Sequence, residues 1–167
     1  MKRLGLTQRV QEIAEYGERR DCLDQRWSSL LGGLGYWPIP LANLVENVEA
    51  YVVTLGLDGV ILTGGNDLCE AGSKGMLAPE RDKFEHRLLD VFAELHLPVL
   101  GVCRGLQILN LHHGGGVSPV ANHAARRHQM RYHSDSFLGK TAPDEVNSFH
   151  DFGISESDRG PRMMASA

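Results

Sequence analysis

Cysteine, long apolar runs and excess positive charge are all scarce in this sequence. The three cysteines are odd in number and scattered, which argues against a disulfide framework. No apolar run approaches the roughly 18 residues of a membrane-spanning helix, and polar residues interrupt the N-terminal stretch before a signal peptide could form. A formal net charge of −4 disfavours a general electrostatic hold on nucleic acid or anionic lipid. We therefore expect a cytoplasmic protein that binds neither nucleic acid nor membranes.

What the sequence does contain is enough apolar material for a stable core. A chain of 167 residues with 42% apolar and 23% charged residues is typical of a globular domain, and a domain of this size needs no disulfide or metal to fold. No internal repeat or linker interrupts the sequence, so we expect one domain over residues 1–167. The 19 glycines lie between apolar runs and indicate tight turns between strands and helices.

Apolar stretches alternate with amphipathic ones along the chain. Helices are expected at residues 17–34, 45–55 and 80–96, and strands or extended segments at 4–7, 36–41, 59–63 and 99–102. This alternation predicts a doubly wound α/β domain, in which helices cover both faces of a mostly parallel sheet. Chemistry in such sheets lies at the carboxyl ends of the strands. Two of those ends carry unusual residues, at 63–67 and 101–105.

The second of these strand ends has the pattern of a nucleophile elbow with cysteine in place of serine. Cys103 follows an apolar strand, precedes a predicted helix, and has Gly101 and Gly105 two residues to either side. Glycines at these places allow a sharp turn from strand to helix. The helix N-terminus would lower the pKa of the thiol and could bind an oxyanion. The alternative is a small buried cysteine in a tight turn.

Four segments together resemble a known family. They are residues 58–67, 81–85, 97–110 and 146–150, in this order and with matching spacing. With these motifs the sequence resembles the class I glutamine amidotransferase-like superfamily, and within it the γ-glutamyl-γ-aminobutyrate hydrolase type, known as peptidase C26. The resemblance implies a flavodoxin-like fold and a hydrolase that needs no cofactor and no metal.

The resemblance also implies roles for individual residues. Cys103 would attack a γ-glutamyl carbonyl of a small-molecule substrate, and water would hydrolyse the resulting glutamyl thioester. The backbone N–H groups of Gly65 and Arg104 would form the oxyanion hole. The remaining positions that it places near the substrate are Gly64, Asn66, Gln107, Asn147, Ser148 and His150, with Arg104 also near the glutamyl group.

The sequence departs from this family at its C-terminal end. Family members carry the general base in a His-Pro-Glu motif, and this sequence contains none. We therefore expect a chain whose C-terminal part is missing, whose exposed apolar surface favours a homo-oligomer, and whose turnover is slow. His150 is the histidine at a family-matched position. It is expected to be a loop residue, a substrate contact or a substitute base.

Other histidines and cysteines carry weaker signals. His123, His128 and His133 recur every five residues, and this period does not align three ligands on one face of a helix, so a metal site is not favoured. The same segment is locally basic, which indicates either a solvated face or a patch for an anionic part of the substrate. Cys22 is expected in the core and Cys69 in a loop.

A narrower resemblance concerns the N-terminal part. Residues 7–9 and the charged stretch 18–27 are similar to the branch that hydrolyses γ-glutamyl-CDP-amidate in bacterial capsule phosphoramidate synthesis. Arginines at this strand end could meet a phosphorylated leaving group, although surface ion pairs explain the charges equally well. Two function classes stay open. One is a free-standing γ-glutamyl hydrolase, and the other is a glutaminase subunit that delivers ammonia to a synthetase partner. An inactive remnant is a third possibility.

Overall fold

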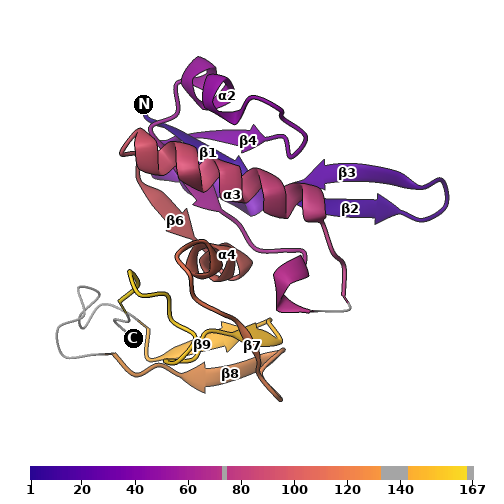
Figure 1. The fold of residues 1–167 in the computed structure, drawn as a ribbon, viewed down its shortest axis with the longest axis vertical. Coiled ribbons are helices and arrows are strands. Elements are labelled where there is room, and N and C mark those ends of the chain that lie inside the picture. The colour runs from indigo at the N-terminus through magenta and orange to yellow at the C-terminus, as the bar shows by residue number, and fades with distance from the viewer. Residues whose placement is uncertain (73–74, 133–142, 165–167) are drawn as a thin grey trace.

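The fold is built on a four-stranded parallel sheet (Figure 1). The computed structural model describes residues 1–72, 75–132 and 143–164. The order of the strands in the sheet is β4-β1-β5-β6, and all three neighbouring pairs are parallel. Their bounds are β1 Arg3–Thr7, β4 Trp37–Leu41, β5 Gly59–Leu62 and β6 Val99–Gly101. The predicted strands and the predicted parallel sheet are confirmed.

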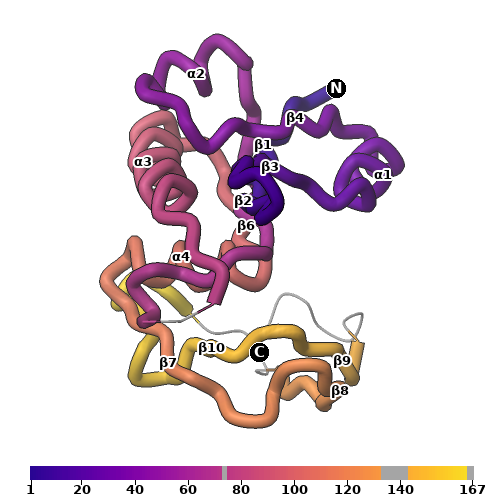
Figure 2. Tube along the Cα trace, turned by 90° about the vertical axis from the view of Figure 1, so that its right-hand side faces the viewer, coloured from indigo at the N-terminus to yellow at the C-terminus, as the bar shows by residue number. Residues whose placement is uncertain are grey.

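Helices cover both faces of this sheet, as predicted (Figure 2). Side chains alternate between the two faces along each strand. Val60 and Leu62 pack in one apolar cluster with α2 (Val48–Leu55), α3 (Pro79–Glu94) and α4 (Arg104–His112). Leu6 and Ile61 pack on the opposite face against α1 (Gln25–Gly33). This layering leaves the carboxyl ends of the strands as the edge where loops gather.

Local signals set the ends of the helices. Pro79 is the first residue of α3, where its missing N–H costs no hydrogen bond. The Asn47 side chain caps α2 by accepting a hydrogen bond from the Ala50 N–H at 2.9 Å, and Gly56 ends that helix in the left-handed conformation. The helices predicted at 45–55 and 80–96 are confirmed to within a few residues.

The prediction of a helix from residue 17 is wrong in its first part. A hairpin precedes α1 and consists of β2 (Arg9–Ile13) and β3 (Glu18–Cys22). Gly17 turns the hairpin with a φ of +65°. The helix begins only after Asp24, whose side chain accepts a hydrogen bond from the Arg26 N–H at 2.9 Å. The apolar spacing within 23–34 was a true helical signal, but it does not extend back through the charged residues of β3.

Short elements after α4 form a second layer beneath it (Figures 1 and 2). Two small antiparallel sheets pair β7 (Ser118–Pro119) with β10 (Phe152–Gly153) and β8 (Arg126–Gln129) with β9 (Glu145–Ser148). A 3₁₀ helix, η1, spans Cys69–Ala71 before α3. Over the described residues, no helix has both the length and the apolar character needed to cross a bilayer.

The buried Asn110 side chain of α4 fastens this layer to the rest of the fold. Its Nδ2 donates hydrogen bonds to the carbonyl oxygens of Gly116 and Asp158 at 2.8 and 2.9 Å. Its Oδ1 accepts a hydrogen bond from the Gly160 N–H at 2.8 Å. One fully buried side chain therefore holds the segment after α4 and the segment near residue 160 together.

Candidate active site

Cys103 lies at the tip of the turn between β6 and α4. Its backbone has φ +55° and ψ −114°, a conformation that residues other than glycine rarely adopt. The residue is exposed, although its neighbours Arg104 and Gly105 are buried. A strained backbone that presents an exposed thiol at a helix N-terminus is the geometry of a nucleophile elbow.

The two flanking glycines are required by close backbone contacts. A Cβ atom on Gly101 would lie 2.5 Å from the carbonyl oxygen of Gly105, and one on Gly105 would lie 1.9 Å from that of Leu62. Neither contact can be relieved by moving a side chain, because the opposing atoms belong to the backbone. The G-x-C-x-G pattern therefore has the steric cause expected from the sequence.

The Gly64–Gly65 turn after β5 lies against the thiol. A Cβ on Gly64 would be 3.9 Å from the Cys103 Sγ. Gly65 has φ +124° and is exposed. The backbone N–H groups of Gly65 and Arg104 donate no hydrogen bond to any described residue. Both amides are thus available to a ligand beside Cys103.

Arg81 of α3 holds this turn from inside the protein. Its guanidinium is fully buried and donates hydrogen bonds to the carbonyl oxygens of Thr63 at 2.7 Å and Gly64 at 3.1 Å. Desolvation lowers the pKa of Arg81 to about 10, against the opposing pull of the Glu85 carboxylate, so the group remains a cation at neutral pH. A charged and well-paired side chain fixes the orientation of both carbonyls, and with them the turn.

Arg104 holds the elbow through the same group of charges. Its side chain is buried and donates to the carboxylates of Glu85 and Asp82 on α3. Glu85 also accepts a hydrogen bond from Arg81 Nε at 2.9 Å. Two buried cations and two carboxylates therefore balance, and we call Arg81, Asp82, Glu85 and Arg104 the charge cluster. The Arg104 side chain is turned into the protein, so the expected place of this residue near the glutamyl group stays a prediction for its backbone.

The carbonyl of Phe152 brings Gln107 and His150 together. Gln107 lies one turn into α4 from Cys103, and its Nε2 donates a hydrogen bond to the Phe152 carbonyl at 2.7 Å. His150 Nδ1 donates to the same carbonyl, also at 2.7 Å. A protonated Nδ1 leaves the Nε2 of a neutral imidazole with its lone pair. Ser148, two residues before His150, is buried, and its hydroxyl has no hydrogen-bond partner among the described residues.

The other predicted substrate residues differ in position. Asn66 is buried, and its amide bonds the backbone N–H and C=O of Val10 at 2.8 and 2.7 Å, so the side chain anchors the hairpin. A contact of Asn66 with substrate would have to use its backbone. Asn147 is an exposed residue of β9, paired in register with Arg127 of β8.

Three imidazoles form a row at this end of the molecule. The His123 ring lies 4.7 Å from that of His128 and 4.6 Å from that of His150, measured between centroids. Desolvation and the two neighbouring imidazoles lower the pKa of His123. His128 lies on a strand, so the argument from helical rotation does not apply to it, and His133 lies outside the described residues. Among the described residues, no three His, Cys, Asp or Glu side chains are arranged to hold a metal ion.

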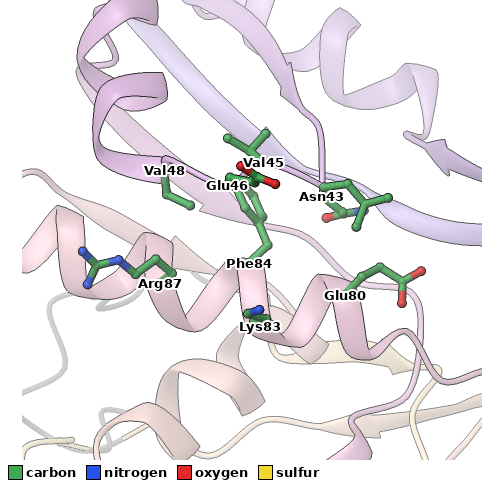
Figure 3. A pocket seen from close by; sticks show the side chains of 9 residues that line it. Asn43, Val45, Glu46, Val48, Glu80, Lys83, Phe84 and Arg87 are labelled. Carbon is green, nitrogen blue, oxygen red and sulfur yellow. The ribbon is translucent and has the colours of Figure 1, made fainter.

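Cavities lie on both sides of the sheet edge. A cavity of about 220 Å³ borders Gly64 and Gly65 and is also lined by Arg9, Cys22 and Trp27. A cavity of about 460 Å³ lies between the β4–α2 loop and α3, where Glu80, Lys83 and Arg87 line it (Figure 3). The larger cavity contains no residue of the elbow or of the Gly64–Gly65 turn. The larger cavity is therefore not part of the site around the Cys103 thiol.

Sequence reasoning missed the charge cluster and the packing of Arg9 against Gly65. The spacing of Arg81 and Glu85, four residues apart on one helix, is a signal that could have suggested their ion pair. Nothing in the sequence pattern indicated that both would be fully buried. The sequence placed Arg9 at a strand end where it could meet a phosphorylated leaving group, but it did not indicate that the side chain packs against Gly65, where an added Cβ would meet Arg9 Cβ at 2.6 Å.

Comparison with known proteins agrees with this geometry. The profile of the Peptidase C26 family matches residues 4–167. A protein named gamma-glutamyl-CDP-amidate hydrolase from Campylobacter jejuni is 32% identical over 154 residues, which cover 90% of this chain and 71% of that protein. The putative glutamine amidotransferase-like protein YvdE of Lactococcus lactis is 30% identical over 164 residues, covering 84% and 69%. A solved structure of a glutamine amidotransferase from Thermotoga maritima shares the fold, with a TM-score of 0.61, 18% identity, and coverage of 95% of this chain and 69% of that one.

Proposed function

Because this chain belongs to the peptidase C26 family, we propose that it hydrolyses a γ-glutamyl amide bond with the Cys103 thiol as nucleophile. The observation that carries the proposal is the backbone of Cys103, which has a φ of +55° and presents an exposed thiol at the start of α4. Such strain persists only where the surrounding structure enforces it, and it is concentrated at functional sites.

The chemistry follows from these positions. The Cys103 thiolate adds to the γ-carbonyl carbon, the carbon–nitrogen bond breaks, and the amine departs after it takes up a proton. Water then attacks the thioester, releasing glutamate and returning the thiol. The tetrahedral intermediates carry a negative oxygen, and the unbonded N–H groups of Gly65 and Arg104 support an oxyanion hole at this place.

We assign the glutamyl group to the side of the elbow that carries Gln107, Ser148 and His150. The Gln107 amide and the His150 imidazole share one acceptor, and the Ser148 hydroxyl is buried without a partner in the described residues. A buried and unpaired hydroxyl is destabilising unless a ligand or a water satisfies it. The lone pair on His150 Nε2 makes this residue the described histidine to test as a base.

The substrate that we propose to test first is γ-glutamyl-CDP-amidate. The support is the similarity to the Campylobacter jejuni protein of that name, together with the cationic Arg9 beside the Gly64–Gly65 turn. Hydrolysis of this substrate gives glutamate and a cytidine diphosphoramidate. A role in capsule phosphoramidate synthesis would follow from that product.

The test combines chemical labelling with turnover. A diazo-ketone analogue of glutamine should label Cys103 and neither Cys22 nor Cys69. Desolvation and the hydrogen bond with Asp82 raise the pKa of the Cys69 thiol, which lowers its reactivity. Labelling that persists in Cys103→Ser would overturn the assignment of the nucleophile.

Turnover distinguishes the two function classes. A free-standing hydrolase should release glutamate from γ-glutamyl-CDP-amidate or γ-glutamyl-p-nitroanilide without a partner, and Cys103→Ala should abolish this release. Activity confined to glutamine, and dependent on an added synthetase, would identify a glutaminase subunit instead.

A further inference from the structure

A groove leads away from the Gly64–Gly65 turn, on the side of the sheet covered by α1. The cavity of about 220 Å³ at this turn and a second cavity of about 300 Å³ share Asp24 and Trp27 as lining residues. Leu30 and Arg26 line the second cavity. We call the two cavities together the amine-side groove.

The end of the groove nearest the thiol carries the guanidinium of Arg9. Arg9 is exposed and lines the groove together with Asp24, whose pKa is lowered to about 2 mainly by its hydrogen bonds with Arg26 and in part by the charge of Arg9. Its stem packs against Gly65, which fixes the side chain beside the amide proposed for the oxyanion hole. The other charges in the groove, Asp24 and Arg26, pair with each other at 2.6 Å. The net charge of the three is therefore +1.

The far end of the groove is apolar and aromatic. Trp27 is half-buried, because part of its indole packs on the cluster formed by Leu6, Leu31 and Ile61. The indole also lines both cavities. Leu30, one turn further along α1, is 54% exposed. An indole that packs on the core with one part and lines a cavity with another offers a surface on which a planar ring can stack.

We propose that the amine-side groove binds the leaving half of the substrate as a nucleoside phosphate, with the phosphate on Arg9 and the base on Trp27. The proposal rests on the proposed function, which puts the scissile amide at Cys103. The order of groups along the groove then matches the ligand: amide nitrogen, phosphoryl group, and planar ring. The cavity between the β4–α2 loop and α3 offers no such order, because it does not border the Gly64–Gly65 turn that lies against the thiol.

Trp27 itself can report binding. The chain has two tryptophans and four tyrosines, so Trp37→Phe leaves Trp27 as the sole tryptophan, and excitation at a wavelength that tyrosine does not absorb reports on it alone. Titration with CDP should quench its fluorescence in a saturable way, and cytidine should bind at least about 10-fold more weakly because it cannot use Arg9. In this background Arg9→Gln should weaken CDP binding by about 10- to 100-fold and cytidine binding by less than about 3-fold.

The matched control is Arg20→Gln. Arg20 lies on β3 and pairs with Glu18 outside the groove, so its removal should leave CDP affinity unchanged. If Arg9→Gln does not fold, Arg9→Lys replaces it and should weaken CDP binding more than the control does. No quenching of Trp27 by CDP, or equal losses for CDP and cytidine in the Arg9 variant, would overturn the proposal.

CDP carries no γ-glutamyl group, so this experiment measures binding without turnover. If Cys103 is labelled and CDP does not bind, the groove assignment fails and the proposed hydrolysis stands. If CDP binds as described and Cys103→Ser is still labelled, the assignment of Cys103 as nucleophile fails, and what stands is that the groove binds a nucleoside phosphate.

Discussion

Glu85→Gln is the sharpest test of the charge cluster. The substitution keeps the shape of a side chain that is fully buried and that bonds both Arg81 and Arg104. It removes one of the two negative charges, so the buried cluster changes from neutral to a net charge of +1. The new amide NH₂ also brings a donor to a place where both guanidiniums already donate.

The expected cost is large for an isosteric change. Loss of one partner from a buried ion pair destabilises by about 3–5 kcal/mol, against a total free energy of unfolding of about 5–15 kcal/mol for an ordinary domain. At about 2–4 °C per kcal/mol for a chain of this size, the thermal midpoint should fall by roughly 6–20 °C. Because Arg81 also holds the Thr63 and Gly64 carbonyls, kcat should fall more than KM rises.

Asp90→Asn is the matched control on the same helix. Asp90 also pairs with an arginine, Arg87, but both side chains are about half exposed, and its second contact, with His112 Nε2, is long at 3.7 Å. Exposed pairs contribute less than about 1 kcal/mol. Circular dichroism during heating, with urea unfolding to check that the m-value is unchanged, compares the two variants. If Glu85→Gln unfolds within about 1 kcal/mol of Asp90→Asn, the cluster is not the desolvated network described above.

Three further predictions address the elbow, the imidazole and the C-terminal segment. Gly105→Ala should lower the urea midpoint strongly, because the new Cβ would meet the Leu62 carbonyl oxygen at 1.9 Å. The control Gly32→Ala, in open space on α1, should raise the free energy of unfolding by about 0.5–1 kcal/mol. Equal urea midpoints for the two variants would contradict the steric argument. His150→Ala should reduce glutamate release by about 100-fold or more while Cys103 remains labelled, and unchanged turnover would exclude His150 as the base. Hydrogen bonds from Ser155 and Ser118 lower the pKa of Asp158, so this carboxylate stabilises the fold above its unfolded pKa of about 3.9 and that stabilisation is lost as pH falls through the folded value. Asp158→Asn should therefore flatten the dependence of the thermal midpoint on pH below about pH 4, and an unchanged acid slope would contradict this.

The parts of the fold that sequence predicted are those governed by local rules. Continuous apolar strands and amphipathic helices have periods that can be counted, and Pro79 and Gly56 mark helix ends by their own backbone preferences. The elbow was predictable for the same reason, because its two glycines are required by close contacts with residues of the same turn and with the adjacent strand.

The parts that sequence did not predict depend on contacts between distant residues. The hairpin of β2 and β3 is held by Asn66, which lies 56 residues beyond Val10. The strands of the hairpin are rich in charged residues and lack the apolar alternation that would predict a strand. Burial of Glu85 depends on a second cation from Arg104, 19 residues further along the chain, and Arg104 in turn needs Asp82. Ion pairs between distant residues follow no period and leave no mark on local composition. From the sequence pattern, these residues can therefore be described only as charged residues on a helix.

The carbonyl oxygen of Phe152 makes one part of the site invisible to alanine scanning. Both contacts that join Gln107 and His150 end on this main-chain atom, so replacing Phe152 changes the ring and leaves the acceptor in place. The residue type found at this position in other proteins therefore carries no information about the contact. Only a change to the backbone itself reaches it, such as an ester in place of the amide that joins Phe152 to Gly153, which makes the carbonyl a poorer acceptor. A segment grafted over residues 149–153 could differ at every side chain except His150 and still hold the imidazole, provided that it returns one carbonyl to the same point in space.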